Sequence, residues 1–146
     1  MRVETEVVIN RTTDEVLGFI VDVAGSTMWS ENTVEAIQTS NGPVTIGSTC
    51  KIVTRAMDRI ITHEFEVTDY CPGKQYTVHS ISGPFHVTMS YITQEVPEGT
   101  RLRAVSEVEL VGPMALLGTV MSERIQKQFD SDHSNLKRLL ESPSNV

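Results

Sequence analysis

One long amphipathic segment near the end of the chain, residues 113–141, restricts the folds that this sequence can adopt. At about 100° per residue, its apolar side chains gather in one broad stripe: Met114, Leu117, Met121, Ile125, Phe129, Leu136, Leu139 and Leu140. With a rise of about 1.5 Å per residue, a helix over this segment is about 44 Å long, enough to cross a whole sheet. We therefore expect a long helix that packs its stripe against the rest of the chain.

Most of the chain before that segment alternates between apolar and polar residues, which is the pattern of β-strands. Residues 2–9 predict a first strand, and six more are predicted at 33–40, 47–55, 59–69, 74–81, 85–95 and 100–110. Turn-forming residues fill the gaps: Asn41-Gly42-Pro43, Met57-Asp58, Pro72-Gly73, Gly83-Pro84 and Pro97-Glu98-Gly99. Connections this short favour antiparallel pairing of consecutive strands.

Two short helices are predicted between the first and second strands. Thr12 and Glu15 fit a capping box, and apolar residues follow at helical spacing as far as Val23. This helix is expected to end near Ala24-Gly25, and a second short helix over 26–30 includes Trp29.

These elements predict an α+β fold in which a curved, antiparallel, seven-stranded sheet wraps around the long C-terminal helix. A sheet of this size cannot leave both faces bare, so a helix packed on its concave face is the economical solution. The length of 146 residues suits one domain. We assign it to residues 1–142 and regard residues 143–146 as a short tail.

Composition and charge restrict the partners. The net charge of −7 disfavours nucleic acid and anionic membranes, since both require a basic surface. No apolar run approaches the length of about 20 residues that a membrane span needs, so no membrane insertion is expected. The N-terminal residues 1–10 read as a strand rather than a signal peptide. Cys50 and Cys71 lie far apart and suggest reduced thiols in a cytoplasmic protein.

The inner faces of the strands and the first half of the helix are expected to enclose a cavity. A curved sheet and a straight helix do not match in shape, and methionines form a pliable wall. The predicted ligand-binding residues are Trp29, Ile52, Phe65, Tyr76, Val78, Val87, Met89, Tyr91, Ala104, Ser106, Met114, Leu117, Met121, Ile125 and Gln128. Because no arginine or lysine is placed on an inner strand face, an anionic ligand is not expected.

Polar residues on the helix stripe allow two interpretations. Gly118 and Ser122 either permit close packing or leave room for a ligand, and Gln128 either bonds nearby backbone or contacts that ligand. Asp132 is interpreted as a structural polar anchor, because an aspartate on a packed face usually meets a helix N-terminus or an arginine.

Three inner residues are candidates for acid–base chemistry: His63, Tyr76 and Tyr91. The alternative for His63 is a core histidine whose hydrogen bonds are met by Ser106, Tyr91 or a carbonyl. The four histidines (His63, His79, His86 and His133) show no metal-ligand spacing, and no GxSxG motif occurs. Neither a metal nor a cofactor is expected.

The order of elements resembles that of the SRPBCC superfamily, also called START-like or helix-grip, which includes polyketide cyclase/dehydrase and lipid-transfer domains. The local similarities are Asp22 and Trp29, which resemble the family's helix-one to helix-two segment, the strand-opening Gly47, the hairpin Tyr70-Cys71-Pro72-Gly73, and Gly99-Thr100 of the final hairpin. The resemblance spans essentially the whole chain. It implies a helix-grip fold and, for an enzyme of this family, catalysis by positioning a flexible chain while a tyrosine, serine or histidine polarises carbonyls.

Three functions remain open at this point. The leading hypothesis is a module that binds a hydrophobic small molecule (lipid, isoprenoid or polyketide-like) in the cavity. The second is a polyketide cyclase/aromatase or dehydratase acting there. The third is a protein-interaction module whose interior is filled, with Phe65, Met89, Tyr91 and Met121 in mutual contact. The chain is expected to be a monomer or a homodimer.

Overall fold

The computed structural model describes residues 1–56, 58–110 and 112–142, without the side chains of Met114, Leu117 and Thr119. The predicted tail, residues 143–146, and Met57 of one predicted turn lie outside the described residues. In chain order the elements are β1 (Arg2–Ile9), α1 (Thr13–Val21), the 3₁₀ turn η1 (Val23–Gly25), α2 (Ser26–Trp29), β2 (Thr33–Gln38), β3 (Thr49–Ala56), β4 (Arg59–Cys71), β5 (Gln75–Ser82), β6 (His86–Val96), β7 (Gly99–Glu109) and α3 (Met114–Glu141). The α+β helix-grip fold predicted from the sequence is confirmed.

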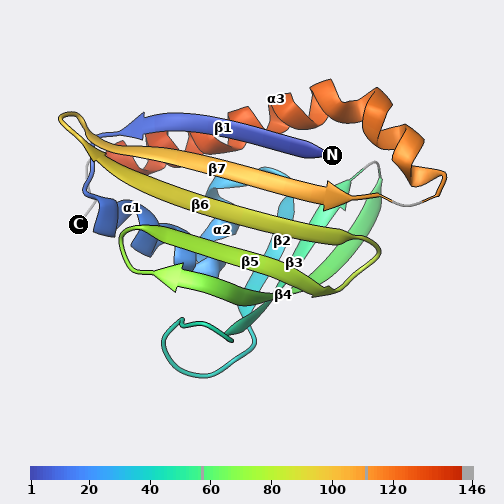
Figure 1. Ribbon diagram of the computed structural model, residues 1–146, viewed down its shortest axis with the longest axis horizontal. Helices are drawn as coiled ribbons and strands as arrows, with labels where there is room; N and C mark the ends of the chain where they lie inside the picture. The colour runs from blue at the N-terminus through green and yellow to red at the C-terminus, as the bar shows by residue number, and fades with distance from the viewer. Residues whose placement is uncertain (57, 111, 143–146) are drawn as a thin grey trace.

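The strands form one antiparallel sheet in the order β1-β7-β6-β5-β4-β3-β2. Consecutive strands pair from β2 to β7, as the short turns predict, and β1 adds to the far edge beside β7 (Figure 1). The register places Ile52 opposite His63 and Tyr76 opposite Tyr91, so these side chains share the inner face.

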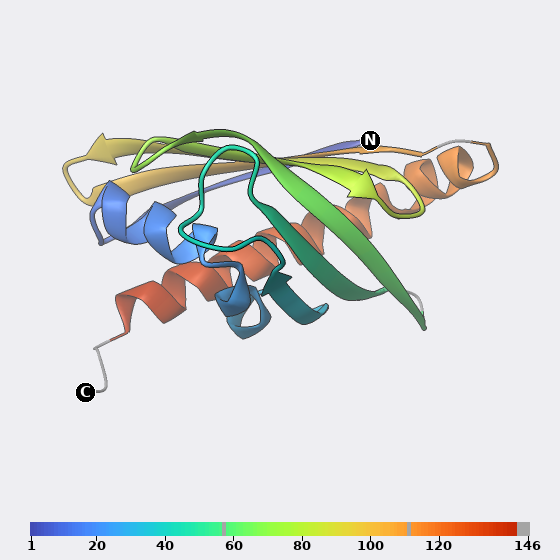
Figure 2. The ribbon, with the colours of Figure 1, turned by 90° about the horizontal axis from the view of Figure 1, so that it is seen from below.

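The sheet is strongly bent along β4. The pairing of β4 with β5 shifts register at two places, between Glu64 and Phe65 and between Val67 and Asp69. Such irregularities bend a strand and increase its twist. Figure 2 shows β4 running diagonally away from the plane of the other strands. This bend opens space between the inner face and the short helices that lie on the same side.

Helix α1 begins as the sequence predicts. Thr12 Oγ1 accepts a hydrogen bond from the Glu15 backbone N–H at 3.1 Å, and the Glu15 carboxylate accepts one from the Thr12 N–H at 3.3 Å. This capping box satisfies two backbone donors that would otherwise lack partners. The helix buries Val16, Leu17 and Ile20 against the sheet.

The two halves of α3 differ in their packing. In the second half Leu136 is fully buried and Phe129 nearly so, and Leu139 and Leu140 pack against the same core. In the first half Leu116 and Val120 are 74% and 81% exposed. Gly118 lies where an added Cβ would be 2.6 Å from a Leu110 methyl carbon, so this glycine permits close packing.

Helix α3 runs along β1 at the edge of the sheet (Figure 1). Gln126 Nε2 donates to the Glu4 carbonyl oxygen at 2.8 Å, and Lys137 Nζ donates to the Val8 carbonyl oxygen at 2.7 Å. These two side chains therefore satisfy backbone acceptors of β1 that no neighbouring strand could reach. The helix covers the β1 edge, and its axis does not pass over the inner face of β3 to β5.

Candidate ligand-binding cavity

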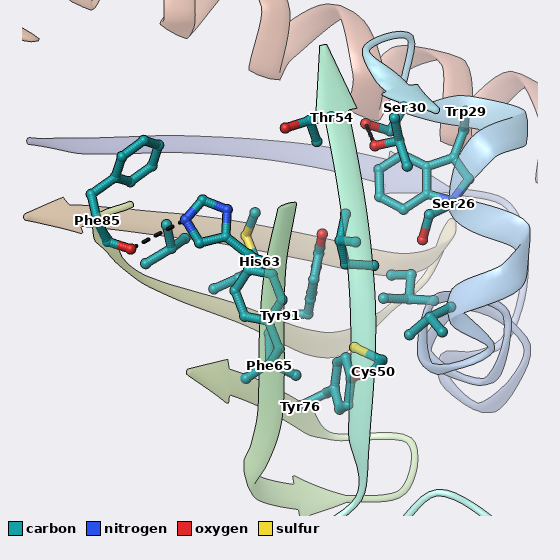
Figure 3. Close-up of a pocket in the computed structure, with 17 residues that line it drawn as sticks. Ser26, Trp29, Ser30, Cys50, Thr54, His63, Phe65, Tyr76, Phe85 and Tyr91 are labelled. Carbon is teal, nitrogen blue, oxygen red and sulfur yellow. Dashed lines mark hydrogen bonds between the residues drawn. The ribbon is translucent and has the colours of Figure 1, made fainter. Parts of the chain in front are cut away.

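A cavity of about 280 Å³ lies between the bent part of the sheet and the short helical segment from α1 to α2. It is lined by Ile20, Val23, Ser26, Trp29, Ser30, Thr33, Cys50, Ile52, Thr54, His63, Phe65, Tyr76, Val78, Phe85, Val87, Met89 and Tyr91 (Figure 3). Its strand walls come from β3 to β6 and from Thr33 at the start of β2, because the bend of β4 moves this part of the sheet away from the sheet plane. Its volume is just below the usual range of about 300–1,000 Å³ for small-molecule pockets.

Many of the residues predicted to bind a ligand line this cavity: Trp29, Ile52, Phe65, Tyr76, Val78, Val87, Met89 and Tyr91. All three residues with predicted acid–base roles, His63, Tyr76 and Tyr91, line it too. The alternation of side chains between the two faces of each strand therefore brings inward-facing residues of β3 to β6 to the walls of one cavity.

Several other predicted residues lie elsewhere. Ala104 and Ser106 are buried on β7, where they pair with β1 and β6. Met121, Ile125 and Gln128 belong to α3, and within the described residues no α3 side chain lines the cavity. The side chains of Met114 and Leu117 lie outside the described residues. The physical reason is the position of α3, which follows β1 while the cavity lies under β3 to β6.

Gln128 contributes to a different feature, a polar junction between α3 and the loop after α2. Asp132 Oδ1 accepts from Gln128 Nε2 at 2.8 Å and from the Glu31 backbone N–H at 3.1 Å. Asp132 Oδ2 accepts from Ser30 Oγ at 3.4 Å. Asp132 is thus a structural anchor. Its backbone partner, Glu31, lies just after the C-terminal end of α2, whereas the sequence led us to expect a helix N-terminus or an arginine.

His63 is buried on β4 and has a defined tautomer. Its Nε2 lies 3.1 Å from the Phe85 carbonyl oxygen, which can only accept, so Nε2 carries the proton. Burial lowers the pKa of His63, outweighing the opposite effect of this hydrogen bond. The ring is therefore neutral at pH 7, and among the described residues Nδ1 has no hydrogen-bond partner, so its lone pair can accept a hydrogen bond. Figure 3 shows this second nitrogen on the side of the ring that faces away from Phe85, toward Thr54.

A turn glycine makes the position of this ring possible. Gly83 has φ of +136°, and a Cβ built there would lie 2.2 Å from His63 Cδ2. Any other residue would collide with the imidazole and adopt an unfavourable backbone conformation. Phe85 packs edge-on to the same imidazole, with ring centroids 4.8 Å apart. The turn before β6 thus fixes both the place and the tautomer of His63.

Tyr76 and Tyr91 form a stacked pair on neighbouring strands. Their ring centroids are 6.3 Å apart and their planes differ by 20°. Burial raises the pKa of each phenol well above its ordinary value, so both remain protonated at neutral pH. Within the described part of the chain neither hydroxyl has a hydrogen-bond partner. Each can donate to, or accept from, a group inside the cavity.

The cavity carries no ionised side chain among its described lining residues, since His63 is neutral and the rest are apolar, hydroxyl-bearing or a thiol. Burial raises the pKa of the Cys50 thiol to about 11, so it is protonated as well. A buried charge without a partner is strongly unfavourable. The lining therefore matches an uncharged molecule.

The sequence of the whole chain fits one known family. The family model described as "Polyketide cyclase / dehydrase and lipid transport" matches residues 1–141. The chain belongs to this family. The START-like, SRPBCC resemblance expected from the sequence is thereby confirmed. No curated protein matches the chain.

Solved structures of similar fold include a START superfamily protein and an aromatase/cyclase. The protein TTHA0849 from Thermus thermophilus is 17% identical, with a TM-score of 0.82 over 96% of this chain and 97% of that one. Zhui aromatase/cyclase from Streptomyces sp. R1128 is 14% identical, with a TM-score of 0.69 over 95% of each chain. A START superfamily protein from Mycobacterium smegmatis is 13% identical, with a TM-score of 0.74 over 96% and 97%. At these identities the similarity establishes the fold alone.

Other kinds of site find little support in this polyketide cyclase/dehydrase family member. Among the described residues, no three or more histidines, cysteines or acidic residues cluster so that they could hold a metal ion. His79 and His86 stack with centroids 6.4 Å apart, and His79 Nδ1 lies 2.8 Å from the Thr88 hydroxyl. In the described part of the chain no helix has both the length and the hydropathy to cross a membrane.

Sequence reasoning missed the contribution of the helical segment to the cavity. Ile20, Val23 and Ser26 line it together with Trp29. Ile20 and Val23 were placed on an apolar helix face, but that face could equally have packed in the core. The cavity is also lined by Cys50, Thr54 and Phe85. Their positions alternate in step with the other inward-facing residues of their predicted strands, and this alternation is the signal that could have identified them.

Proposed function

We propose that the protein binds a hydrophobic small molecule, a lipid, isoprenoid or polyketide-like compound, in the cavity between the bent sheet and the α1–α2 segment. The observation that supports this most is the cavity itself, whose lining is largely apolar and has a few uncharged polar groups. Ligand pockets in proteins usually have this make-up. The description of the family, which includes lipid transport, agrees with the proposal.

Native mass spectrometry of freshly purified protein tests the proposal directly. The native mass should exceed the denatured mass by that of a co-purifying apolar compound. After the compound is extracted, adding it back should raise the melting temperature, because a ligand at about 100 times its Kd stabilises the folded state by about 2.7 kcal/mol. If no added mass is found and no lipid, isoprenoid or polyphenol raises the melting temperature, binding in this cavity is not the function.

A second candidate is an enzyme, a cyclase/aromatase or dehydratase acting in the same cavity. It is favoured by the combination of an unprotonated His63 Nδ1 with two protonated phenols, Tyr76 and Tyr91, along one cavity. A neutral imidazole can accept a proton from a carbon next to a carbonyl, and a phenol can donate a hydrogen bond to the carbonyl oxygen. A similar structure is named as an aromatase/cyclase.

The two candidates differ in their response to His63→Ala. An enzyme would lose turnover on a polyketide-like substrate while still binding it. A binding module would have no turnover to lose, and it would still bind apolar compounds through the remaining lining residues, although more weakly where the compound bonds His63. The third hypothesis, a filled interior, has less support, because Phe65, Met89 and Tyr91 line a cavity instead of filling the interior.

A further inference from the structure

The size of the cavity restricts the ligand. Its volume is about 280 Å³. An engineered apolar cavity of about 150 Å³ takes up benzene. The space here therefore suits a molecule of about two fused rings, and it is too small to enclose a lipid with two acyl chains.

The charge of the lining restricts it further. None of the described lining residues is ionised at neutral pH, so a carboxylate or an ammonium group would enter the cavity without a partner. Desolvation without compensation makes such binding unfavourable. The ligand that fits is uncharged.

Hydrogen bonding supplies the third restriction. The hydroxyls of Ser26, Thr54, Tyr76 and Tyr91 can all rotate, and each can either donate or accept. His63 is different, because its Nε2 proton is committed to the Phe85 carbonyl oxygen and its Nδ1 can only accept. A ligand without a donor would exclude solvent from Nδ1 and leave that acceptor unpaired, which weakens binding. A ligand hydroxyl would pair with it.

We propose that the cavity selects an uncharged molecule of about two rings whose hydroxyl group donates a hydrogen bond to His63 Nδ1. This inference rests on the proposed binding function and names the class of ligand for the same cavity. It makes His63 the residue that distinguishes hydroxylated ligands from otherwise similar apolar ones, and the turn at Gly83 the feature that keeps its accepting nitrogen available.

Four probes test the inference by calorimetry or fluorescence titration: 2-naphthol, 2-methoxynaphthalene, 2-naphthoate and the long-chain alcohol farnesol. 2-Naphthol should bind at least about tenfold more tightly than 2-methoxynaphthalene, which is similar in shape but has no donor, a ratio that corresponds to about 1.4 kcal/mol. The anion 2-naphthoate should bind more weakly than either. In His63→Phe the ratio should fall to about one, whereas the exposed matched control His79→Phe should keep it.

A measurement on the unmutated protein covers the case in which His63→Phe fails to fold. In protein labelled with ¹⁵N at histidine, 2-naphthol should shift the Nδ1 resonance of His63, and 2-methoxynaphthalene should leave it close to its ligand-free position. An unchanged Nδ1 resonance with bound 2-naphthol would overturn the inference.

The outcomes separate this inference from the binding function on which it rests. Equal affinity for 2-naphthol and 2-methoxynaphthalene, or tighter binding of 2-naphthoate, would overturn the hydroxyl selection and leave cavity binding intact. Binding of farnesol alone would overturn the two-ring size and still support cavity binding. If no probe binds and native mass spectrometry finds no added mass, both proposals fail.

Discussion

At the residue scale, the chemistry of the cavity depends most on how His63 is held. A backbone carbonyl from the turn before β6 fixes its tautomer, and Gly83 provides the space that the ring occupies. The sequence suggested two alternatives for His63, a core histidine bonded to a carbonyl or a group available for chemistry. The structure combines them, since Nε2 bonds a carbonyl and Nδ1 has no partner in the described part of the chain.

Gly83→Ala should therefore disturb ligand binding as well as stability. The new Cβ would lie 2.2 Å from His63 Cδ2, and the positive φ of +136° adds strain. We expect a loss of roughly 1–3 kcal/mol in unfolding free energy. The imidazole should also be displaced, so that the preference for 2-naphthol over 2-methoxynaphthalene is reduced. Urea unfolding and probe titration measure the two effects.

Gly42→Ala is the matched control for that substitution. Gly42 also has a positive φ, +83°, but nothing lies within 4 Å of an added Cβ. It should cost stability through the backbone alone and leave probe selectivity unchanged. Equal selectivity in the two variants would mean that Gly83 does not hold His63 in place.

Residue-scale prediction from the sequence succeeded where the alternation of a strand was sufficient. It placed His63, Phe65 and Tyr76 on the inner face because side chains of a strand alternate between faces. It could not supply the tautomer of His63, because the carbonyl that sets it belongs to Phe85, far along the chain. Such a contact depends on tertiary structure and leaves no periodic signal.

At the element scale, Asp132 joins α3 to the loop that follows α2. Burial raises the pKa of Asp132, although its hydrogen bonds with Gln128, Glu31 and Ser30 act in the opposite direction. The folded state therefore favours the protonated carboxyl more than the unfolded state does. This preference stabilises the folded state fully at pH values below the ordinary pKa of about 3.9. The stabilisation is lost as the pH rises through the higher pKa that Asp132 has in the folded state.

Asp132→Asn should consequently gain stability relative to the wild type as the pH rises from about 4 toward neutral. The amide oxygen can still accept from the Glu31 N–H, and the buried charge is removed. Asp132→Ala should instead cost about 1–3 kcal/mol, because that N–H loses its partner. Urea unfolding at several pH values tests both, and Asp130→Asn controls for losing one negative charge at an exposed site. A constant difference between Asp132→Asn and wild type across this range would contradict the explanation.

Element boundaries were predictable because caps and turns are local. The predicted strands begin and end within a few residues of the observed ones, and the capping box of Thr12 and Glu15 is present. The packing of α3 on the sheet was predictable, but its polar contacts with the edge strand were not. An amphipathic stripe shows which side of a helix is buried, but not that Gln126 and Lys137 of the same helix bond backbone carbonyls of β1.

At the scale of the whole molecule, the cavity and the main core lie side by side. Leu136, Leu102 and Ile9 are fully buried in the core beside the cavity. The cavity-lining rings of Trp29 and Tyr91 lie 5.3 and 5.9 Å, centroid to centroid, from the ring of His133 on α3. Occupying the cavity should therefore stabilise the bent part of the sheet together with its contact to α3. A probe inside the cavity wall should report on this part of the molecule.

Cys50 is such a probe. It lines the cavity, is 6% exposed, and has a pKa raised to about 11 by burial, whereas Cys71 is exposed. In a Cys71→Ser variant at pH 8, iodoacetamide should alkylate Cys50 far more slowly than a free thiol, since the reactive thiolate is scarce and access requires opening. Saturating 2-naphthol should slow the reaction further, by about 100-fold at 100 times its Kd when only the ligand-free protein opens. The converse variant, Cys50→Ser, should react rapidly at Cys71 with or without ligand. Rapid alkylation of Cys50 in the folded protein would show instead that solvent reaches the cavity without any opening, and an unchanged rate with bound 2-naphthol would place that ligand outside the cavity.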